Sequence, residues 1–217
     1  LENYIKKNFN QLKKSKKIKL LDIGPCGGAI TTLFALRSLD KFNLLDKVEI
    51  YLLDIVPDVI NLTKKRNFDL PKEMIKEYGF GFAGESGQKY KKLMQSNKVK
   101  GIIGDGETLP KTVRDMDIVL AGYLHHHMNL ITRKNLAAQM ERATKKGGFI
   151  GVVDFYVQNY EEYMNWYRPH FTKHKTPPPV ECPLLDGNIL SSWYKNTSIK
   201  DVNNNLEKSF TFWGIKK

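Results

Sequence analysis

The sequence predicts an α/β protein in which helices cover both faces of a mostly parallel β-sheet. Short apolar runs alternate with stretches of helical spacing, which is typical of repeated strand–helix units. These runs end in glycine or acidic residues, as in Asp22-Ile-Gly24, where a strand would turn into a helix. The length of 217 residues, with 41% hydrophobic and 27% charged residues, suits one globular domain.

The first strand is predicted at residues 18–24, and a stretch of near-helical spacing follows at residues 30–36. The second strand is predicted at residues 48–54, before Pro57, a residue favoured at a helix start. The alternating run at residues 210–215 is expected to return as an antiparallel strand. Between them, strands are predicted at residues 102–103, 117–121 and 148–154, and a helix at residues 129–143.

Two segments interrupt this alternation. Residues 68–98 form an insertion between the second and third strands, with a helix expected at residues 88–96. Residues 155–194 hold nine of the chain's 24 aromatic residues, about twice a proportional share. We therefore expect a basic N-terminal helix at residues 1–17 and one domain at residues 18–217 that carries both segments.

Positive charge is concentrated at the N-terminus. The chain has 35 Lys and Arg against 23 Asp and Glu, a net charge of +12. The first twenty residues hold seven lysines and one acid, Glu2, so they carry half of that excess. A solvated helix face is the simplest explanation, and a surface for nucleic acid or an anionic membrane is the functional alternative.

Cysteine usage and hydropathy bear on the compartment. The chain has two cysteines, Cys26 and Cys182, which favours a reducing compartment over a disulfide-rich secreted fold. No apolar run approaches the roughly 20 residues that a membrane-spanning helix needs, and no secretory signal is recognised. We expect a cytoplasmic protein without a transmembrane segment.

The polar residues that end the predicted strands should line one crevice, because ligands bind outside the carboxyl ends of parallel strands. These residues are Asp22, Asp54, Asp105, Ala121 with Gly122, and Asp154. The turn at residues 22–28 has glycines that would let a ligand approach the backbone. Cys26 and Ala29 stand where a dinucleotide fingerprint has glycine, which argues against a pyrophosphate, and the absence of Gly-Lys-Ser/Thr excludes a P-loop.

The same turn resembles motif I of the class I S-adenosylmethionine-dependent methyltransferases. In that motif an acid is followed by glycines at alternating positions, here Asp22, Gly24, Cys26 and Gly28, with Cys26 departing from the usual middle glycine. Three later segments match the family in order, at residues 104–110, 117–126 and 145–154, and the second resembles motif IV with the histidine-bearing loop of many small-molecule methyltransferases. The resemblance spans residues 18–156 and implies a Rossmann-like methyltransferase fold, a seven-stranded, mostly parallel sheet with an antiparallel last strand.

The resemblance implies a site for S-adenosyl-L-methionine, with S-adenosyl-L-homocysteine as the product. Asp54 would accept hydrogen bonds from the two ribose hydroxyls, which suits the paired oxygens of a carboxylate. Asp105 would receive the adenine amino group, and Asp22 would also support the turn. The implied cofactor-binding residues are Asp22, Gly24, Cys26, Gly28, Asp54, Ile55, Asp105, Gly106 and Ala121.

Candidate bases follow the fourth strand. His125, His126 and His127 are consecutive, so at most two of them can face the crevice. Histidine titrates near neutral pH and can take a proton from a hydroxyl or an ammonium group. The alternative is that one histidine caps the next helix and the others are solvated. We predict Tyr123, His125 and His126 as the catalytic residues and assign Asp154 no role beyond solvation.

Four tyrosines would share one face of a helix because they are spaced four, three and four residues apart: Tyr156, Tyr160, Tyr163 and Tyr167. This stripe is either plain packing or a wall over the methyl acceptor, where phenol groups contact a cationic amine. No Cys or His spacing matches a zinc site, so no metal is expected.

We predict methyl transfer to an O, N or C nucleophile of a small molecule or a lipid headgroup. One alternative is an RNA methyltransferase that uses the N-terminal lysines and the basic stretch at residues 89–100 as a phosphate track. Another is a non-catalytic S-adenosylmethionine-binding module. The missing Asn/Asp-Pro-Pro-Tyr/Phe motif and the missing Pro-Cys nucleophile count against modification of a nucleic-acid base. The sequence indicates neither the acceptor atom nor the oligomeric state.

Overall fold

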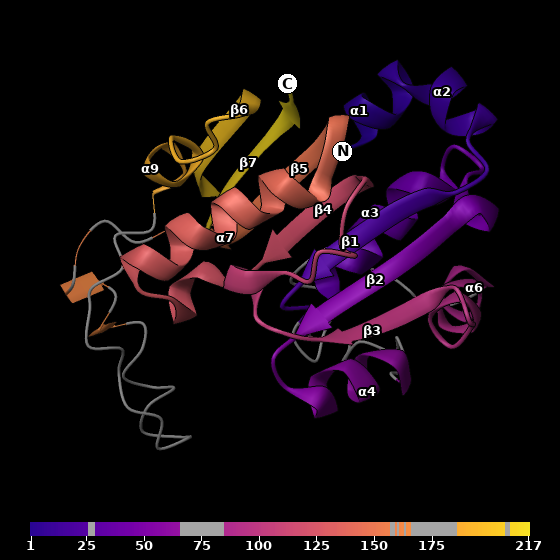
Figure 1. Ribbon diagram of the computed structural model, residues 1–217, viewed down its shortest axis with the longest axis horizontal. Coiled ribbons are helices and arrows are strands. Elements are labelled where there is room, and N and C mark those ends of the chain that lie inside the picture. The colour runs from indigo at the N-terminus through magenta and orange to yellow at the C-terminus, as the bar shows by residue number, and fades with distance from the viewer. Residues whose placement is uncertain are drawn as a thin grey trace.

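The computed structural model confirms the α/β fold class (Figure 1). It describes residues 1–25, 29–65, 85–156, 159, 161–162, 164–165, 186–206 and 209–217. Within these residues one seven-stranded sheet has the order β3-β2-β1-β4-β5-β7-β6. Its strands are β1 (Ile18–Ile23), β2 (Val48–Asp54), β3 (Val99–Ile103), β4 (Met116–Gly122), β5 (Thr144–Phe155), β6 (Thr197–Leu206) and β7 (Ser209–Lys216).

Strands β1 to β5 pair in parallel, as predicted. β7 pairs antiparallel with both β5 and β6, so the predicted antiparallel last strand is confirmed. β6 lies at the edge of the sheet beyond β7 and was not among the strands predicted individually. β3 begins at Val99, three residues before the predicted strand.

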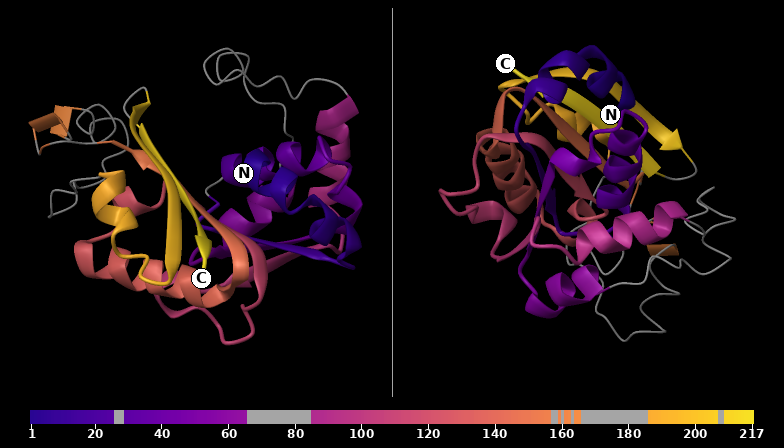
Figure 2. Two further views of the ribbon diagram at one scale, coloured as in Figure 1. Left: turned by 90° about the horizontal axis from the view of Figure 1, so that it is seen from above. Right: turned by 90° about the vertical axis from the view of Figure 1, so that its right-hand side faces the viewer.

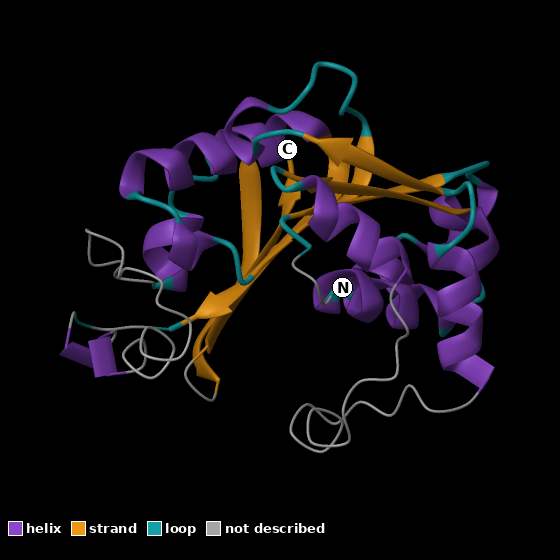
Figure 3. Ribbon diagram, turned by 90° about the horizontal axis from the view of Figure 1, so that it is seen from below, coloured by secondary structure: helices purple, strands orange, loops and turns teal. Residues whose placement is uncertain are grey.

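Helices cover both faces of the sheet (Figures 1 and 2). They are α1 (Glu2–Lys7), α2 (Phe9–Lys14), α3 (Ile30–Asp40), α4 (Pro57–Lys65), α6 (Glu85–Met94), α7 (Leu130–Ala143) and α9 (Gly187–Ser191), with 3-10 turns η1 (Leu45–Lys47), η2 (Gly106–Thr108) and η3 (His125–His127). Residues of α1, α2, α3 and α6 belong to the hydrophobic cluster on one face, and those of α7 and α9 to the cluster on the other. Figure 3 shows the strands running between these two groups.

Side chains alternate along each central strand and contribute to the hydrophobic clusters on both faces of the sheet. Leu20 of β1 packs in the cluster that contains Leu36 of α3, whereas the next residue, Leu21, packs in the cluster that contains Leu136 of α7. Successive side chains of a strand point to opposite faces, so a strand covered on both faces reads as a continuous apolar run. This is why the central strands were visible in the sequence.

The basic N-terminal segment forms two short helices that meet at Asn8, where a single helix was expected. Tyr4, Ile5 and Leu12 are buried on their inner side, and the lysines of both helices are exposed. The segment leads directly into β1, so it lies toward the end of the sheet where the parallel strands begin (Figure 1). Among the described residues, no helix combines the length and apolarity that crossing a membrane requires.

Candidate functional site

The carboxyl ends of the central strands meet at one edge of the sheet. Ile23 of β1 pairs with Leu53 of β2 and with Ala121 of β4, so the residues that follow, Gly24 and Asp54, lie level with each other. The strand order reverses here, because β2 and β3 lie on one side of β1 and β4 and β5 on the other. Ligands of open α/β sheets bind at such a switch point. We call this part of the molecule the carboxyl edge.

Asp22 ties β1 to the start of α3. Its side chain is completely buried, and Oδ2 accepts hydrogen bonds from the Thr32 N–H at 3.1 Å and from the Thr31 hydroxyl at 2.8 Å. Burial raises the pKa of Asp22 to about 6, and these hydrogen bonds oppose the rise. The prediction that every strand-end acid lines one crevice is wrong for Asp22, which instead holds the two ends of the glycine turn together.

Gly24 begins that turn in a conformation that favours glycine. Its φ is +63°, and its N–H donates to the Leu53 carbonyl at 2.8 Å. A Cβ at this position would lie 2.7 Å from a methyl carbon of Leu124, so a side chain is disfavoured by space as well as by conformation. The next two predicted positions of the motif, Cys26 and Gly28, lie outside the described residues.

Asp54 and Asp105 each use one carboxylate oxygen locally. Oδ1 of Asp54 accepts from the Val56 N–H at 2.9 Å, and Oδ1 of Asp105 accepts from the Glu107 N–H at 2.8 Å. In the described part of the chain, the second oxygen of each carboxylate has no hydrogen-bond partner. Both acids can therefore accept a hydrogen bond from a ligand without breaking the turn that they stabilise.

The other positions predicted at this edge differ in exposure. Ile55, next to Asp54, is 67% exposed, which is unusual for a large apolar side chain. Gly106 and Ala121 are buried, and a Cβ on Gly106 would approach Ile23 within 3.2 Å. The carboxyl edge thus presents an apolar side chain beside carboxylates. The apolar side chain can contact the flat face of a ligand while the carboxylates accept hydrogen bonds from its polar groups.

The loop after β4 begins with a strained residue. Tyr123 has a φ of +54°, in the left-handed region, which costs a non-glycine residue roughly 1–2 kcal/mol. Its N–H donates to the Val153 carbonyl at 2.8 Å, and its ring lies 5.1 Å from that of Phe155. These contacts with β5 keep Tyr123 at the carboxyl edge, where it was predicted to act. Strain of this kind is concentrated at functional sites.

Asp154, near the end of β5, binds the histidine loop. It is completely buried, and Oδ2 accepts from the His125 N–H at 2.6 Å. Oδ1 accepts from the Phe155 N–H at 2.8 Å and lies 2.8 Å from Nδ1 of His126. The prediction that Asp154 has no role beyond solvation is therefore wrong, and so is its placement in an open crevice.

The contact with Asp154 determines which ring nitrogen of His126 carries a proton. Burial alone would raise the pKa of Asp154, but the contacts with His125 and His126 together outweigh it and hold the pKa well below its usual range. An ionised carboxylate only accepts hydrogen bonds, so the proton between the two side chains belongs to Nδ1 of His126. In the neutral form of the ring the lone pair is then on Nε2, the arrangement of a histidine that takes a proton from a ligand.

The ring of His126 is packed between two aromatic side chains. Its centroid lies 3.8 Å from that of His127 and 5.0 Å from that of Phe155. Part of His127 is exposed, but burial of its ring lowers the pKa of His127 to about 4, so it is not the fully solvated histidine of the alternative. The N-cap of α7, however, is Asn129, whose Oδ1 accepts from the Thr132 N–H at 2.9 Å, so the idea that a histidine caps this helix is wrong.

His125 has a different environment from His126. It is completely buried, and its carbonyl accepts from Nε of Arg133 at 2.9 Å. Nδ1 lies 3.7 Å from Oδ2 of Asp154, beyond hydrogen-bond distance, and neither ring nitrogen has a hydrogen-bond partner among the described residues. Of the two histidines predicted to be catalytic, His126 has the geometry of an oriented base.

Most of the predicted substrate stripe cannot be compared with the structure. Tyr156 is half-buried against the cluster under α7. Tyr160, Tyr163 and Tyr167 lie outside the described residues. In the part of the chain that the structure describes, no group of three or more His, Cys, Asp or Glu side chains is arranged to hold a metal ion.

No protein-family model and no curated protein sequence matches the chain. Solved structures do match, and the PH0226 protein from Pyrococcus horikoshii OT3 aligns over 99% of this chain and 89% of its own, with a TM-score of 0.57 and 13% identity. A SAM dependent methyltransferase from Aquifex aeolicus aligns over 98% and 89%, with a TM-score of 0.52 and 15% identity. The N-methyltransferase NodS from Bradyrhizobium japonicum WM9 aligns over 99% and 97%, with a TM-score of 0.54 and 8% identity. With the sheet order and the antiparallel β7, these matches show that the chain has the fold of the class I S-adenosylmethionine-dependent methyltransferases.

Proposed function

We propose that the chain transfers a methyl group from S-adenosyl-L-methionine to an oxygen, nitrogen or carbon nucleophile of a small molecule or a lipid headgroup. The observation that carries the proposal is the set of groups at the carboxyl edge. A left-handed glycine ends β1, and Asp54 and Asp105 each keep an oxygen without a partner among the described residues. The fold, shared with an enzyme named as an N-methyltransferase, supports the same reading.

The described residues fit the proposed cofactor. The two ribose hydroxyls would donate to Asp54, and the exposed side chain of Ile55 would cover one face of the adenine. Asp105 would accept from the adenine amino group beside Gly106. Gly24 leaves room for the backbone to approach the methionine part, where the proposed set also includes Ala121, Cys26 and Gly28. Asp22 would act on this part through the turn that it holds.

The sulfonium group of the cofactor supplies the activated methyl. The chain's own contribution is position and, for a protonated nucleophile, a base. Nε2 of His126 would accept the proton of the acceptor's hydroxyl or ammonium group, while Asp154 stabilises the imidazolium that forms. His125 would support the loop through its backbone contacts with Asp154 and Arg133.

The acceptor would lie beside Tyr123, whose strained backbone places it between the ends of β4 and β5. Tyr156 follows β5 on the same side, and we propose that Tyr160, Tyr163 and Tyr167 extend this wall. Phenol groups combine apolar area with a polar tip, which suits an amine-bearing or amphipathic acceptor.

Calorimetry with S-adenosylhomocysteine tests the cofactor site. Asp54→Ala should weaken binding at least tenfold, because it removes a charged acceptor for two hydroxyls. Asp46→Ala is the matched control, since it removes an exposed carboxylate beside the other end of β2 and should leave binding unchanged. No binding by the native chain, or equal weakening by both variants, would refute the site.

A panel of amine, phenol and phospholipid acceptors with methyl-labelled cofactor tests the reaction. Transfer to at least one acceptor, lost in Asp54→Ala, supports the enzyme. Tight cofactor binding without transfer to any acceptor of these three classes would favour the non-catalytic binding module over the enzyme.

The RNA methyltransferase alternative gains no support from the position of the N-terminal lysines. Their helices lead into the amino end of β1, whereas Gly24 and Asp54 lie at the carboxyl ends of their strands. A phosphate track that starts on α1 and α2 would have to cross the length of the sheet to deliver a base to His126.

A further inference from the structure

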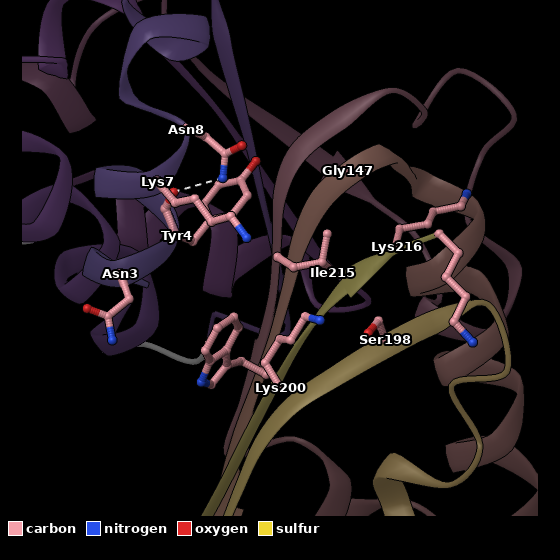
Figure 4. A pocket seen from close by; sticks show the side chains of 11 residues that line it. Asn3, Tyr4, Lys7, Asn8, Gly147, Ser198, Lys200, Ile215 and Lys216 are labelled. Carbon is pink, nitrogen blue, oxygen red and sulfur yellow. Dashed lines mark hydrogen bonds between the residues drawn. The ribbon is translucent and has the colours of Figure 1, made fainter.

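A second candidate site lies between α1 and the β6–β7 pair. It is a groove of about 430 Å³, a volume typical of small-ligand sites. Figure 4 shows Tyr4 and Lys7 of α1 on one side of it and Lys200 of β6 with Lys216 of β7 on the other. Ile215, near the same end of β7, pairs with Phe149 at the start of the apolar part of β5. The groove is therefore at the amino end of the sheet.

The groove is separate from the carboxyl edge. Gly147 lines it, and Asp154, which holds the histidine loop, is seven residues further along β5. The regular part of β5 runs from Phe149 to Asp154, five residue steps that span roughly 17 Å at about 3.3 Å per residue. A small ligand of the groove would not reach His126, so its binding is independent of the proposed methyl transfer.

The charge of the groove is positive. Four lysines line it, Lys7, Lys200, Lys216 and Lys217, and none of the described residues that line it is acidic. Lys216 donates to the carbonyls of Glu141 and Thr144, at 2.6 and 2.8 Å, so its ammonium group is held toward α7 and not toward Lys7. Lys7 and Lys200 form no ion pair with any described residue. Such a set of ammonium groups attracts an anion.

Aromatic side chains line the groove beneath these lysines. Trp213 is half-buried and stacks on Phe149, with ring centroids 5.7 Å apart and planes inclined by 16°. Tyr4 packs against the same phenylalanine at 5.4 Å. A flat indole backed by other rings is a surface on which a nucleobase can stack. Binding of an inorganic anion would not require an indole. Binding to a membrane surface would require apolar side chains that protrude, whereas Trp213 is recessed in the groove.

We propose that this groove binds a nucleoside phosphate, either as a free nucleotide or as one unit of a single-stranded nucleic acid. The phosphate lies between Lys7 and Lys200, and the base stacks against Trp213. Part of the charge excess at the N-terminus then has a specific use, because α1 contributes one wall of the site.

Fluorescence anisotropy with a labelled eight-nucleotide single-stranded RNA tests the proposal. The double variant Lys7→Gln/Lys200→Gln should weaken binding at least tenfold and flatten the salt dependence, because it removes about two phosphate contacts. Lys14→Gln/Lys16→Gln is the matched control, with the same loss of charge at exposed lysines outside the groove, and should change binding less than twofold. Equal weakening by both pairs would show attraction by overall charge and overturn the proposal.

Competition separates the two sources of the ligand and tests stacking. Displacement of the RNA by a mononucleotide at micromolar concentration assigns the groove to free nucleotides, and displacement only by longer strands assigns it to nucleic acid. Trp213→Leu should weaken the RNA or nucleotide at least fivefold and leave competition by inorganic pyrophosphate unchanged. Absence of RNA and nucleotide binding, with Lys7- and Lys200-dependent binding to anionic vesicles, would overturn the proposal in favour of a membrane surface.

Discussion

Oδ1 of Asp154 lies 2.8 Å from Nδ1 of His126, at the point where the end of β5 meets the loop that follows β4. The same carboxylate accepts the backbone N–H of His125, so one buried charge orients an imidazole and anchors the loop that carries it. Two parts of the chain that are 28 residues apart depend on each other here.

Replacing this carboxylate by an amide should destabilise the protein. Asp154→Asn retains one acceptor oxygen and gains an NH₂ group that cannot accept, so at least one of the N–H donors of His125, His126 and Phe155 loses its partner. We expect the free energy of unfolding at pH 7, measured in urea, to fall by about 2–4 kcal/mol. A loss below 0.5 kcal/mol would contradict the anchoring role.

The same variant gives a prediction about pH. The folded pKa of Asp154 lies below its ordinary value of 3.8, so its stabilising effect is present above about pH 4 and is lost as the pH falls below that value. The difference in unfolding free energy between the native chain and Asp154→Asn should therefore narrow between pH 4 and pH 2.5. A difference that stays constant over this range would exclude a lowered pKa.

The tautomer of His126 can be observed without a methyl acceptor. Long-range ¹H–¹⁵N spectra of the neutral ring should show a proton on Nδ1 and none on Nε2, because the ionised Asp154 accepts from Nδ1. In Asp154→Asn the signal should move toward the mixture of tautomers of a solvated ring. The opposite tautomer in the native chain would be incompatible with His126 as the proposed base.

His126→Gln should lower methyl transfer by about 10²–10⁴-fold, the usual contribution of a general base, while the affinity for S-adenosylhomocysteine stays within twofold. His127→Gln, at the exposed neighbouring position, is the control and should retain most of the activity. If the two variants lose activity equally, or if His126→Gln loses cofactor affinity, the assigned role is wrong.

Gly24→Ala should lower both stability and cofactor affinity. A methyl group there meets Leu124 at 2.7 Å and sits at a φ of +63°, so we expect a loss of roughly 1–3 kcal/mol in unfolding free energy. The double variant Gly24→Ala/Leu124→Ala removes the clash but keeps the backbone strain. A double-mutant cycle should therefore show that the effects of the two substitutions on the unfolding free energy are coupled. Strict additivity of these effects would mean that the Leu124 side chain moves away from the added methyl group at no cost in free energy.

Asp22 should give the opposite pH dependence to Asp154. Its folded pKa of about 6 lies above the ordinary 3.8, so the stability that it contributes is present below about pH 4 and is lost as the pH rises through 6. Between pH 4 and pH 7.5 the stability of the native chain should fall by roughly 3 kcal/mol relative to Asp22→Asn, which cannot titrate. A difference that is independent of pH would show that the carboxyl keeps its ordinary pKa.

The strands that the sequence predicted are those whose burial leaves a pattern. β1, β2, β4 and β5 are covered on both faces and read as apolar runs. The edge strand β6 contains Lys200, Asp201 and three consecutive asparagines, and it pairs on one side only, with β7. A half-covered polar strand has neither a continuous apolar run nor a strict alternation of apolar and polar residues. The formation of β6 therefore depends more on its pairing with β7 than on the strand propensity of its own residues.

The candidate site was predicted in part for a similar reason. Asp54 and Asp105 follow strands directly, and their positions come from the strand ends alone. The role of Asp154 depends on the parallel pairing of β4 with β5, which places Gly122 opposite Val153 and so brings the histidine loop to the next residue. The sequence does show an acid, Asp154, at the end of the strand next to the histidine loop. It does not show that the side chain of Asp154 points inward and not toward solvent, because packing decides that direction.

The contact between Asp22 and Thr32 has a consequence for cofactor choice. A helix N-terminus normally offers its free N–H groups and positive dipole to a phosphate. Here the Thr32 N–H is already occupied, and the group that occupies it is a buried carboxylate that is ionised above about pH 6. A nucleotide pyrophosphate brought to the start of α3 would meet a negative charge, whereas a sulfonium cofactor carries a positive charge and no phosphate. Above about pH 6 the contact between Asp22 and Thr32 therefore disfavours a nucleotide pyrophosphate at the start of α3.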